Sequence, residues 1–299
     1  MLIHNNLTHP PLNDSFMTFI FLAILLFSIN NVLWKKNLEN TSVTSLMAYR
    51  SFFTSVISLI YIWLFVDISL ISFTEFSKVT LGSVSGVLGL FCMLFALKNI
   101  SLQWIGIYNL IGVIFTALYL LIFENFDLNE SVVGILTIFL GFGFFIFSTS
   151  KNRLRITIKQ HFLLILMTLF FTVVSVIHWK NLISNVPPLV IIANQELIVF
   201  IVSLAVTLKT ISSSAIKETI SSKFSQVLLM SILVIGAFTS SLMGLKVTDP
   251  LVSGLLFLAS PLTTILFSAY FFKEKVTTKN WLAIGIISLG AFLLHIQTV

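Results

Sequence analysis

Ten long apolar stretches constrain the fold of this chain more than any other feature. Each is long enough to cross roughly 30 Å of hydrocarbon as a helix. They lie near residues 16–34, 44–66, 79–97, 102–123, 131–150, 161–179, 187–208, 225–245, 250–272 and 280–297. A spanning segment must be a helix or part of a closed barrel, because no water inside a bilayer satisfies a free backbone amide, and these runs lack the alternation of barrel strands. The sequence therefore predicts an all-α membrane protein with ten transmembrane helices.

The composition excludes several other classes of protein. Of 299 residues 57% are hydrophobic and 9% are charged, which is far from the balance of a soluble globular domain. The net charge of +6 does not indicate nucleic-acid binding, because the basic residues are scattered at the ends of the apolar runs, where they anchor helices. Cys92 is the only cysteine, which excludes an intrachain disulfide and a cysteine metal cluster. We expect no metal and no cofactor.

The second half of the chain repeats the first. Three residue pairs recur in the same order at a nearly constant separation, namely Lys98 and Lys246, Glu124 and Glu274, and Gly141 and Gly290. The motif WKKNL at 34–38 recurs as WKNL at 179–182. Such self-similarity indicates a duplication. Because each half holds an odd number of spans, the halves must insert with opposite topology, which predicts two inverted five-helix repeats.

Four segments follow from this duplication. Residues 1–15 form an N-terminal tail, and residues 16–150 form the first five-helix repeat. Residues 151–160 are a basic connection, and residues 161–297 form the second five-helix repeat. The connection is the most basic in the chain, so we predict that it is the boundary between the two halves.

Two charged residues lie inside apolar runs, where an unpaired charge is costly. Arg50 is in the second run and Glu196 is in the seventh, at nearly matching places in the two halves. They are therefore candidates for a pair across a pseudo-twofold axis. Either residue could bind substrate or act as a structural polar contact between helices. Glu196 is also the candidate for proton coupling, because a buried carboxylate needs a cavity, a cation or a hydrogen bond.

Other polar residues mark the fourth and ninth runs and their ends. Tyr108 and Asn109 could orient a small amphipathic solute, or could form bonds between helices. Pro261 is predicted to break the helix of the ninth run. Glu124 and Glu274 close equivalent runs, and they are predicted to bond the start of the next helix, with ion binding as the alternative.

Aromatic and basic residues at the ends of the runs predict the depth of the helix ends and the orientation of the chain in the membrane. Trp34 and Trp179, each followed by lysine, are predicted to be anchors at the membrane surface. The basic residues concentrate in the connections that follow odd-numbered runs. The positive-inside rule then places both termini outside.

Together these features resemble the EamA-type branch of the drug/metabolite transporter superfamily. The resemblance rests on the duplicated five-span halves, WKKNL at the end of the first span, Arg50 in the second, and a repeated pattern of span, Glu, turn and Gly-rich span. It implies a ten-helix inverted-repeat carrier that moves small metabolites, often exporting amino acids or related compounds, through a central cavity between the halves. It also implies that both termini lie inside, which disagrees with the charge distribution, so the orientation stays open.

The same resemblance implies which residues approach the central cavity. They are Asn30, Tyr108, Asn109 and residues of the sixth, eighth and ninth spans, for which His178, Ser240 and Thr264 are the candidates. The proline that the family often has in the fourth span is missing here, where Ile111 or Gly112 takes its place. Pro261 keeps the equivalent proline in the ninth span.

The predicted function is secondary transport of small metabolites, in the direction of export, by alternating access. The alternatives are a facilitative exchanger of another organic solute, a lipid flippase or an accessory membrane subunit. An enzyme is not expected, because the sequence holds no HExxH, GxSxG or supported Cys–His arrangement. The expected partners are a small-molecule substrate and the lipid bilayer of a bacterial inner membrane, and either a monomer or a homodimer is compatible with the sequence.

Overall fold

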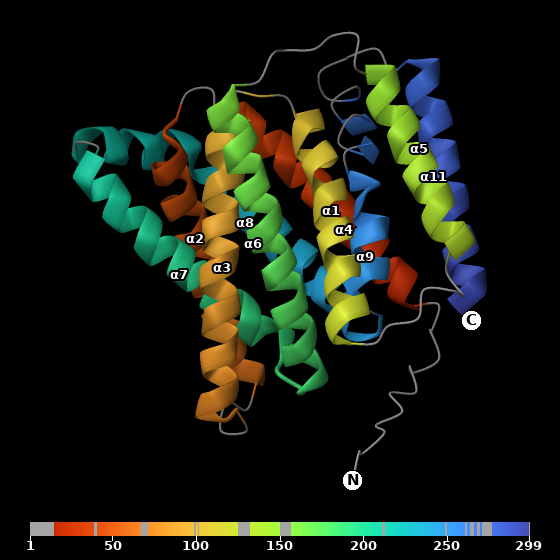
Figure 1. The fold of residues 1–299 in the computed structure, drawn as a ribbon. Helices are drawn as coiled ribbons and strands as arrows, with labels where there is room; N and C mark the ends of the chain where they lie inside the picture. The colour runs from red at the N-terminus through yellow and green to blue at the C-terminus, as the bar shows by residue number, and fades with distance from the viewer. Residues whose placement is uncertain are drawn as a thin grey trace.

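The computed structural model describes the chain as a bundle of helices (Figure 1). The described residues are 15–38, 41–66, 71–98, 100, 102–124, 132–149, 157–210, 213–248, 250–260, 262–263, 266–267, 270 and 277–298. The helices are α1 (Ser15–Leu38), α2 (Val43–Phe65), α3 (Phe73–Leu97), α4 (Leu102–Phe123), α5 (Val132–Thr149), α6 (Ile158–Ile183), α7 (Pro188–Thr210), α8 (Ser213–Lys246), α9 (Pro250–Phe257) and α11 (Thr278–Thr298). All regular structure in this described part is helical, which confirms the predicted all-α class.

Six of the described helices, α1 to α3 and α6 to α8, are long and apolar enough to cross a membrane. Shorter apolar segments lie in α4, α5 and α11, at Ile111–Phe123, Val132–Phe145 and Trp281–Gly290. Large apolar side chains point away from the bundle, as Trp63 (81% exposed) and Leu140 (71% exposed) illustrate. An apolar surface of this kind is expected where helices contact lipid.

The ninth apolar run is interrupted. Helix α9 ends at Phe257, and residues 258–259 form a turn before helical residues resume. The amides of Leu258 and Ala259 donate to carbonyls three residues earlier, which is tighter than α-helical bonding. A break in this run is therefore present, but Pro261, to which the sequence assigns it, lies outside the described residues.

Local sequence determines where several spans start. Ser72 and Glu75 form a capping box at the first turn of α3, and an equivalent box begins α6. The turn between α6 and α7 contains Asn185 with φ of 63°, a left-handed conformation that Asn tolerates. Helix α7 begins with Pro188, whose missing N–H has no helical partner to lose at that position.

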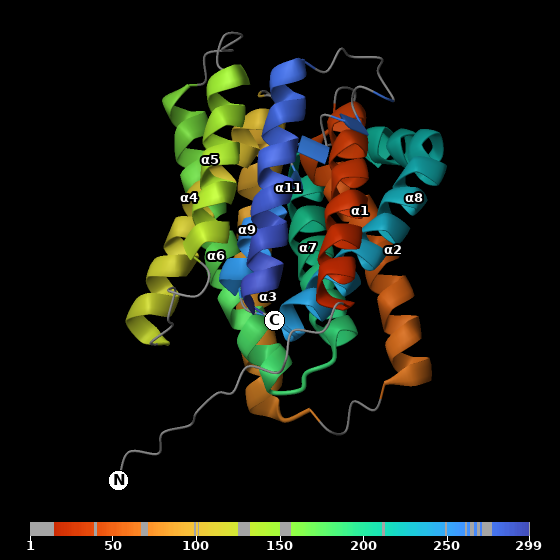
Figure 2. The same cartoon turned by 90° about the vertical axis from the view of Figure 1, so that its right-hand side faces the viewer.

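Helices from one half of the chain pack mainly against helices from the other half. The most extensive contacts are α2 with α7, α5 with α11, α3 with α6, and α1 with α8. Figures 1 and 2 show α5 and α11 side by side at one edge of the molecule. A Cβ on Gly141 would lie 3.0 Å from the amide nitrogen of Ile287, and one on Gly290 would lie 2.8 Å from that of Ile138. Glycine is therefore needed on both helices for this close approach.

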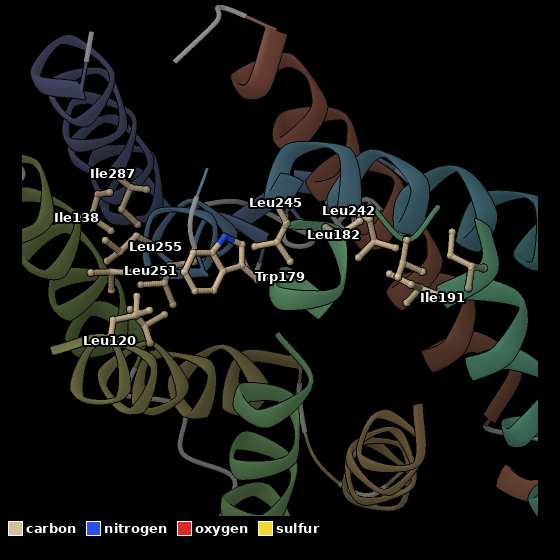
Figure 3. Packing of buried hydrophobic residues seen from close by; sticks show 14 of the residues in the cluster. Leu120, Ile138, Trp179, Leu182, Ile191, Leu242, Leu245, Leu251, Leu255 and Ile287 are labelled. Atoms are coloured by element: carbon tan, nitrogen blue, oxygen red, sulfur yellow. The ribbon is translucent and has the colours of Figure 1, made fainter. Parts of the chain in front are cut away.

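The largest buried apolar cluster joins residues from both halves (Figure 3). It brings Leu120 and Ile138 of the first half together with Trp179 and Leu255 of the second. Trp179 is 8% exposed, and Trp34, in a second cluster, is 1% exposed. The prediction that these tryptophans are anchors at the membrane surface is wrong, because both rings are buried between helices.

Candidate functional site

Arg50 of α2 and Glu196 of α7 form an ion pair in the protein interior. Arg50 Nη2 lies 2.7 Å from Glu196 Oε2, and the two side chains are 2% and 1% exposed. Nη2 also donates to Ser51 Oγ at 2.9 Å, and the guanidinium carbon lies 5.5 Å from the centroid of the Trp34 ring. The pair that the sequence suggested is therefore formed, at the most extensive contact between the two halves.

This ion pair uses only part of its hydrogen-bonding capacity. Arg50 Nε and Glu196 Oε1 are buried and have no partner among the described residues. Removing one member of a buried ion pair costs about 3–5 kcal/mol, because the other charge is left uncompensated. The closed pair therefore holds α2 against α7, and an opened pair would offer a donor and an acceptor to water or solute.

His178 lies in a separate contact between α3, α6 and α7. Its Nε2 is 3.1 Å from Oε1 of Gln195, and its Nδ1 has no partner among the described residues. A Cβ on Gly82 of α3 would meet Cε1 of His178 at 3.2 Å. A Cβ on Gly86 would meet Oε1 of Gln195 at 2.9 Å. These two glycines are therefore helix-contact residues, as their spacing predicts.

A pocket of about 130 Å³ lies between α4, α6 and α9. It is lined by Asn109, Gly112, Val113 and Thr116 of α4, by Thr168, Phe171, Thr172 and Ser175 of α6, and by Pro250, Gly254 and Phe257 of α9. Each helix contributes residues three or four positions apart, which share one helical face. Among the described residues that we predicted to bind substrate, Asn109 is the one that lines this pocket.

The other predicted site residues lie elsewhere. The hydroxyl of Tyr108 is hydrogen-bonded to Nδ1 of His161 on α6, which joins two helices. Asn30 of α1 is buried, and its Oδ1 has no partner among the described residues. Ser240 is buried on α8, between two glycines that face α1. Thr264 lies outside the described residues.

Polar contacts join α4 and α6 on both sides of the pocket. These helices run in the same direction, and the Tyr108–His161 contact precedes the pocket residues on both. Beyond the pocket, Lys180 Nζ lies 2.7 Å from Glu124 Oε1 and 2.9 Å from the hydroxyl of Tyr119. Glu124 therefore bonds the end of α6. Residues 125–131, which lead into the next helix, lie outside the described residues, so the bond of Glu124 to the start of that helix stays a prediction. Glu274 lies outside the described residues.

The hydroxyl groups that line the pocket are not among the site residues predicted from the sequence. Thr168, Thr172 and Ser175 are spaced by four and three residues, so they share a face of an otherwise apolar helix. The residues predicted from this span, His178 and Trp179, lie near its end instead. Hydroxyl residues at helical spacing inside an apolar run are the signal that identifies such a face.

Residues 159–296, from α6 to α11, match the model of the EamA-like transporter family. The chain carries an EamA domain. The second half of the chain is accordingly similar to EamA-like transporters, which agrees with the apolar helices of this protein. The EamA domain supplies α6 and α9 to the pocket and Glu196 to the ion pair.

The chain shares its fold with a solved crystal structure. The TM-score is 0.72 at 18% sequence identity, and the match covers 94% of this chain and 96% of the other. No curated protein matches the sequence.

Proposed function

We propose that this protein is a secondary transporter that exports small metabolites by alternating access. The observation that carries the proposal is the pocket between α4, α6 and α9, because both halves of the chain contribute to it. A solute bound there would face one side of the membrane and then the other as the halves rock. On the family resemblance, the membrane is proposed to be the inner membrane of a bacterium.

The proposal requires two inverted five-helix halves, and the helix contacts support that arrangement. In this arrangement the equivalent helices of the two halves are α1 and α6, α2 and α7, α3 and α8, α4 and α9, and α5 and α11. Three of these equivalent pairs are in contact with each other, namely α2 with α7, α4 with α9, and α5 with α11. The contact of α1 with α8 also has its equivalent, which is the contact of α6 with α3. A twofold relation between the halves produces this pattern.

Individual residues support the same relation. Gly141 approaches Ile287, three residues before Gly290, and Gly290 approaches Ile138, three residues before Gly141. Such reciprocal contacts are characteristic of a twofold interface. Hydrogen bonds repeat as well, since Ser28 of α1 donates to the carbonyl of Ser260 and Thr172 of α6 donates to that of Gly112, each at 3.2 Å.

Counterflow in proteoliposomes tests this function. The purified full-length chain is reconstituted, and vesicles loaded with one unlabelled metabolite at a time are exposed to the same metabolite in labelled form. A carrier takes up the label against its gradient while the internal pool lasts, and the uptake saturates. Counterflow for at least one metabolite is the expected result.

Paired glycine variants connect this transport to the pocket. Gly112→Leu would fill the pocket, where even a Cβ lies 3.2 Å from Thr168 Cγ2, and it is expected to abolish counterflow. Gly143→Leu is the matched control, because nothing lies within 4 Å of a Cβ there. Equal activity of the two variants would contradict the assigned pocket. Single-channel currents or lipid movement without counterflow would instead identify a channel or a flippase.

A further inference from the structure

We propose that the pocket between α4, α6 and α9 selects solutes whose polar end donates hydrogen bonds, such as an amine, an ammonium group or a primary amide, and rejects carboxylates and phosphates. The inference deepens the proposed function by naming the chemistry of the solute, and it rests on that function only for the claim that the bound solute is transported.

The threonine hydroxyls of the pocket have already used their protons. Thr116 Oγ1 donates to the carbonyl of Gly112 at 3.0 Å, and Thr172 Oγ1 donates to the same carbonyl at 3.2 Å. Thr168 Oγ1 lies 2.7 Å from the carbonyl of Leu164 and 3.2 Å from that of Tyr108. A hydroxyl has one proton and two lone pairs, so each of these groups can offer a ligand only acceptor capacity.

The remaining wall favours the same class of ligand. None of the described lining residues carries a charge, so a carboxylate or phosphate would lose its hydration without gaining a cation. Phe171 and Phe257 are also among the lining residues, and aromatic residues attract an ammonium group through the faces of their rings. Asn109 and Ser175 can each accept from the same donor, and because they can also donate, the selectivity rests on the three threonines and on the uncharged lining.

The size of the pocket limits the part of the solute that it holds. A volume of about 130 Å³ is close to the roughly 150 Å³ of an engineered apolar cavity that binds one benzene ring. A single ring with a short polar arm is therefore a suitable probe. Benzylamine, benzamide and benzoate share one ring and differ in the polar group.

Binding of these three probes to the purified full-length chain in detergent tests the proposal. Dissociation constants are measured by isothermal titration calorimetry at neutral pH, where benzylamine is a cation and benzoate an anion. Benzylamine and benzamide are expected to bind at least about tenfold more tightly than benzoate, which corresponds to about 1.4 kcal/mol. Benzoate binding as tightly as the other two would overturn the proposal, and so would failure of all three to bind.

Threonine variants show whether the binding uses the pocket hydroxyls. Thr172→Val removes one acceptor, while the Gly112 carbonyl keeps its bond from Thr116, and we expect about tenfold weaker benzylamine binding. Thr172→Ser keeps the hydroxyl and should bind benzylamine as the wild type does. Thr137→Val is the matched control, because Thr137 is partly exposed on α5, outside the pocket, and also donates to a backbone carbonyl, at 2.8 Å.

If Thr172→Val and Thr137→Val weakened benzylamine binding equally, the proposal would be overturned, because the effect would then not depend on a hydroxyl in the pocket. The binding measurements and the counterflow measurements test different claims. Probe selectivity without counterflow of any metabolite would refute the proposed function and leave the pocket chemistry intact. Counterflow confined to carboxylates or phosphates would refute the pocket chemistry and leave the carrier function intact.

Discussion

At the scale of single residues, the Arg50–Glu196 pair is a contact in which loss of one partner is expected to be costly. Both side chains are almost fully buried, at 2% and 1% exposure, so either charge alone would remain in the interior without a partner. Arg50→Met and Glu196→Leu are each expected to lower the free energy of unfolding by about 3–5 kcal/mol. The double variant should recover most of that loss, because no buried charge remains.

Unfolding of the purified variants in detergent measures these energies as a double-mutant cycle. Lys180→Met is the matched control, because it removes one member of an ion pair whose lysine is 50% exposed. Its cost should stay below about 1 kcal/mol. Additive losses in the Arg50 and Glu196 double variant would show that the buried pair has no coupling.

Glu196 is also the residue that we propose for proton coupling. Its Oε1 has no partner among the described residues, and its Oε2 lies 2.7 Å from Arg50 Nη2. Glu196→Gln keeps the shape of the side chain and removes the titratable group. We therefore expect uptake into proteoliposomes by this variant to be unaffected by a pH gradient that drives uptake by the wild type.

Glu124→Gln serves as the control for this experiment, because it alters a carboxylate in the partly exposed ion pair with Lys180. Its response to the gradient should remain that of the wild type. A wild-type response in Glu196→Gln would remove Glu196 from the coupling role.

The sequence predicted some of these residues and missed others for physical reasons. Arg50 and Glu196 stand out because a charge in an apolar run needs a partner wherever the helices pack. Thr172 does not stand out in the sequence, because a hydroxyl in a membrane helix can donate to a carbonyl of its own helix and does not need a partner on another helix. Which hydroxyls face a pocket depends on helix rotation and packing, and these become visible only in the structure.

At the scale of helices, the contact between α5 and α11 depends on glycines that face the opposite backbone. A Cβ on Gly290 would lie 2.8 Å from the amide nitrogen of Ile138 and 3.1 Å from the carbonyl oxygen of Gly134. Because backbone atoms cannot move aside as a flexible side chain can, the helices must separate. Gly290→Ala is expected to destabilise the protein by about 1–3 kcal/mol, measured as a shift of the thermal unfolding midpoint.

Gly285 provides the control on the same helix. A Cβ there meets nothing within 4 Å, so Gly285→Ala should leave stability unchanged or slightly raised, since alanine is the better helix former. An equal loss in both variants would indicate that the helix backbone, rather than the contact with α5, is responsible.

Helix positions were largely predictable, because an apolar run must become a helix whatever it packs against. The runs near 102–123 and 131–150 correspond closely to α4 (Leu102–Phe123) and α5 (Val132–Thr149). Helix α8 differs, because it begins at Ser213, before the apolar run near 225. Apolar length marks the part of a helix that lies in lipid, whereas a helix can extend beyond the bilayer on polar residues.

At the scale of the whole molecule, alternating access predicts that the two ends of the pocket open toward opposite sides of the membrane. Tyr108 and Tyr119 are eleven residues apart on α4, or roughly 16 Å at 1.5 Å per residue, and the pocket residues of this helix lie between them. Lys180→Gln should loosen the contact of α6 with Glu124 at one end of the pocket, and Tyr108→Phe should loosen the contact with His161 at the other end.

Cysteine labelling can distinguish the two sides. Ser175→Cys is introduced into a Cys92→Ser background, so that the pocket holds the only thiol. A membrane-impermeant maleimide is then applied to intact cells and to inside-out vesicles. Adding Lys180→Gln is expected to raise the labelling rate several-fold in one preparation, and adding Tyr108→Phe is expected to raise it in the other, because each substitution frees one end of the pocket. Increased labelling from the same side in both variants would contradict alternating access through this pocket, since a carrier must admit solvent to its binding site from both sides in turn.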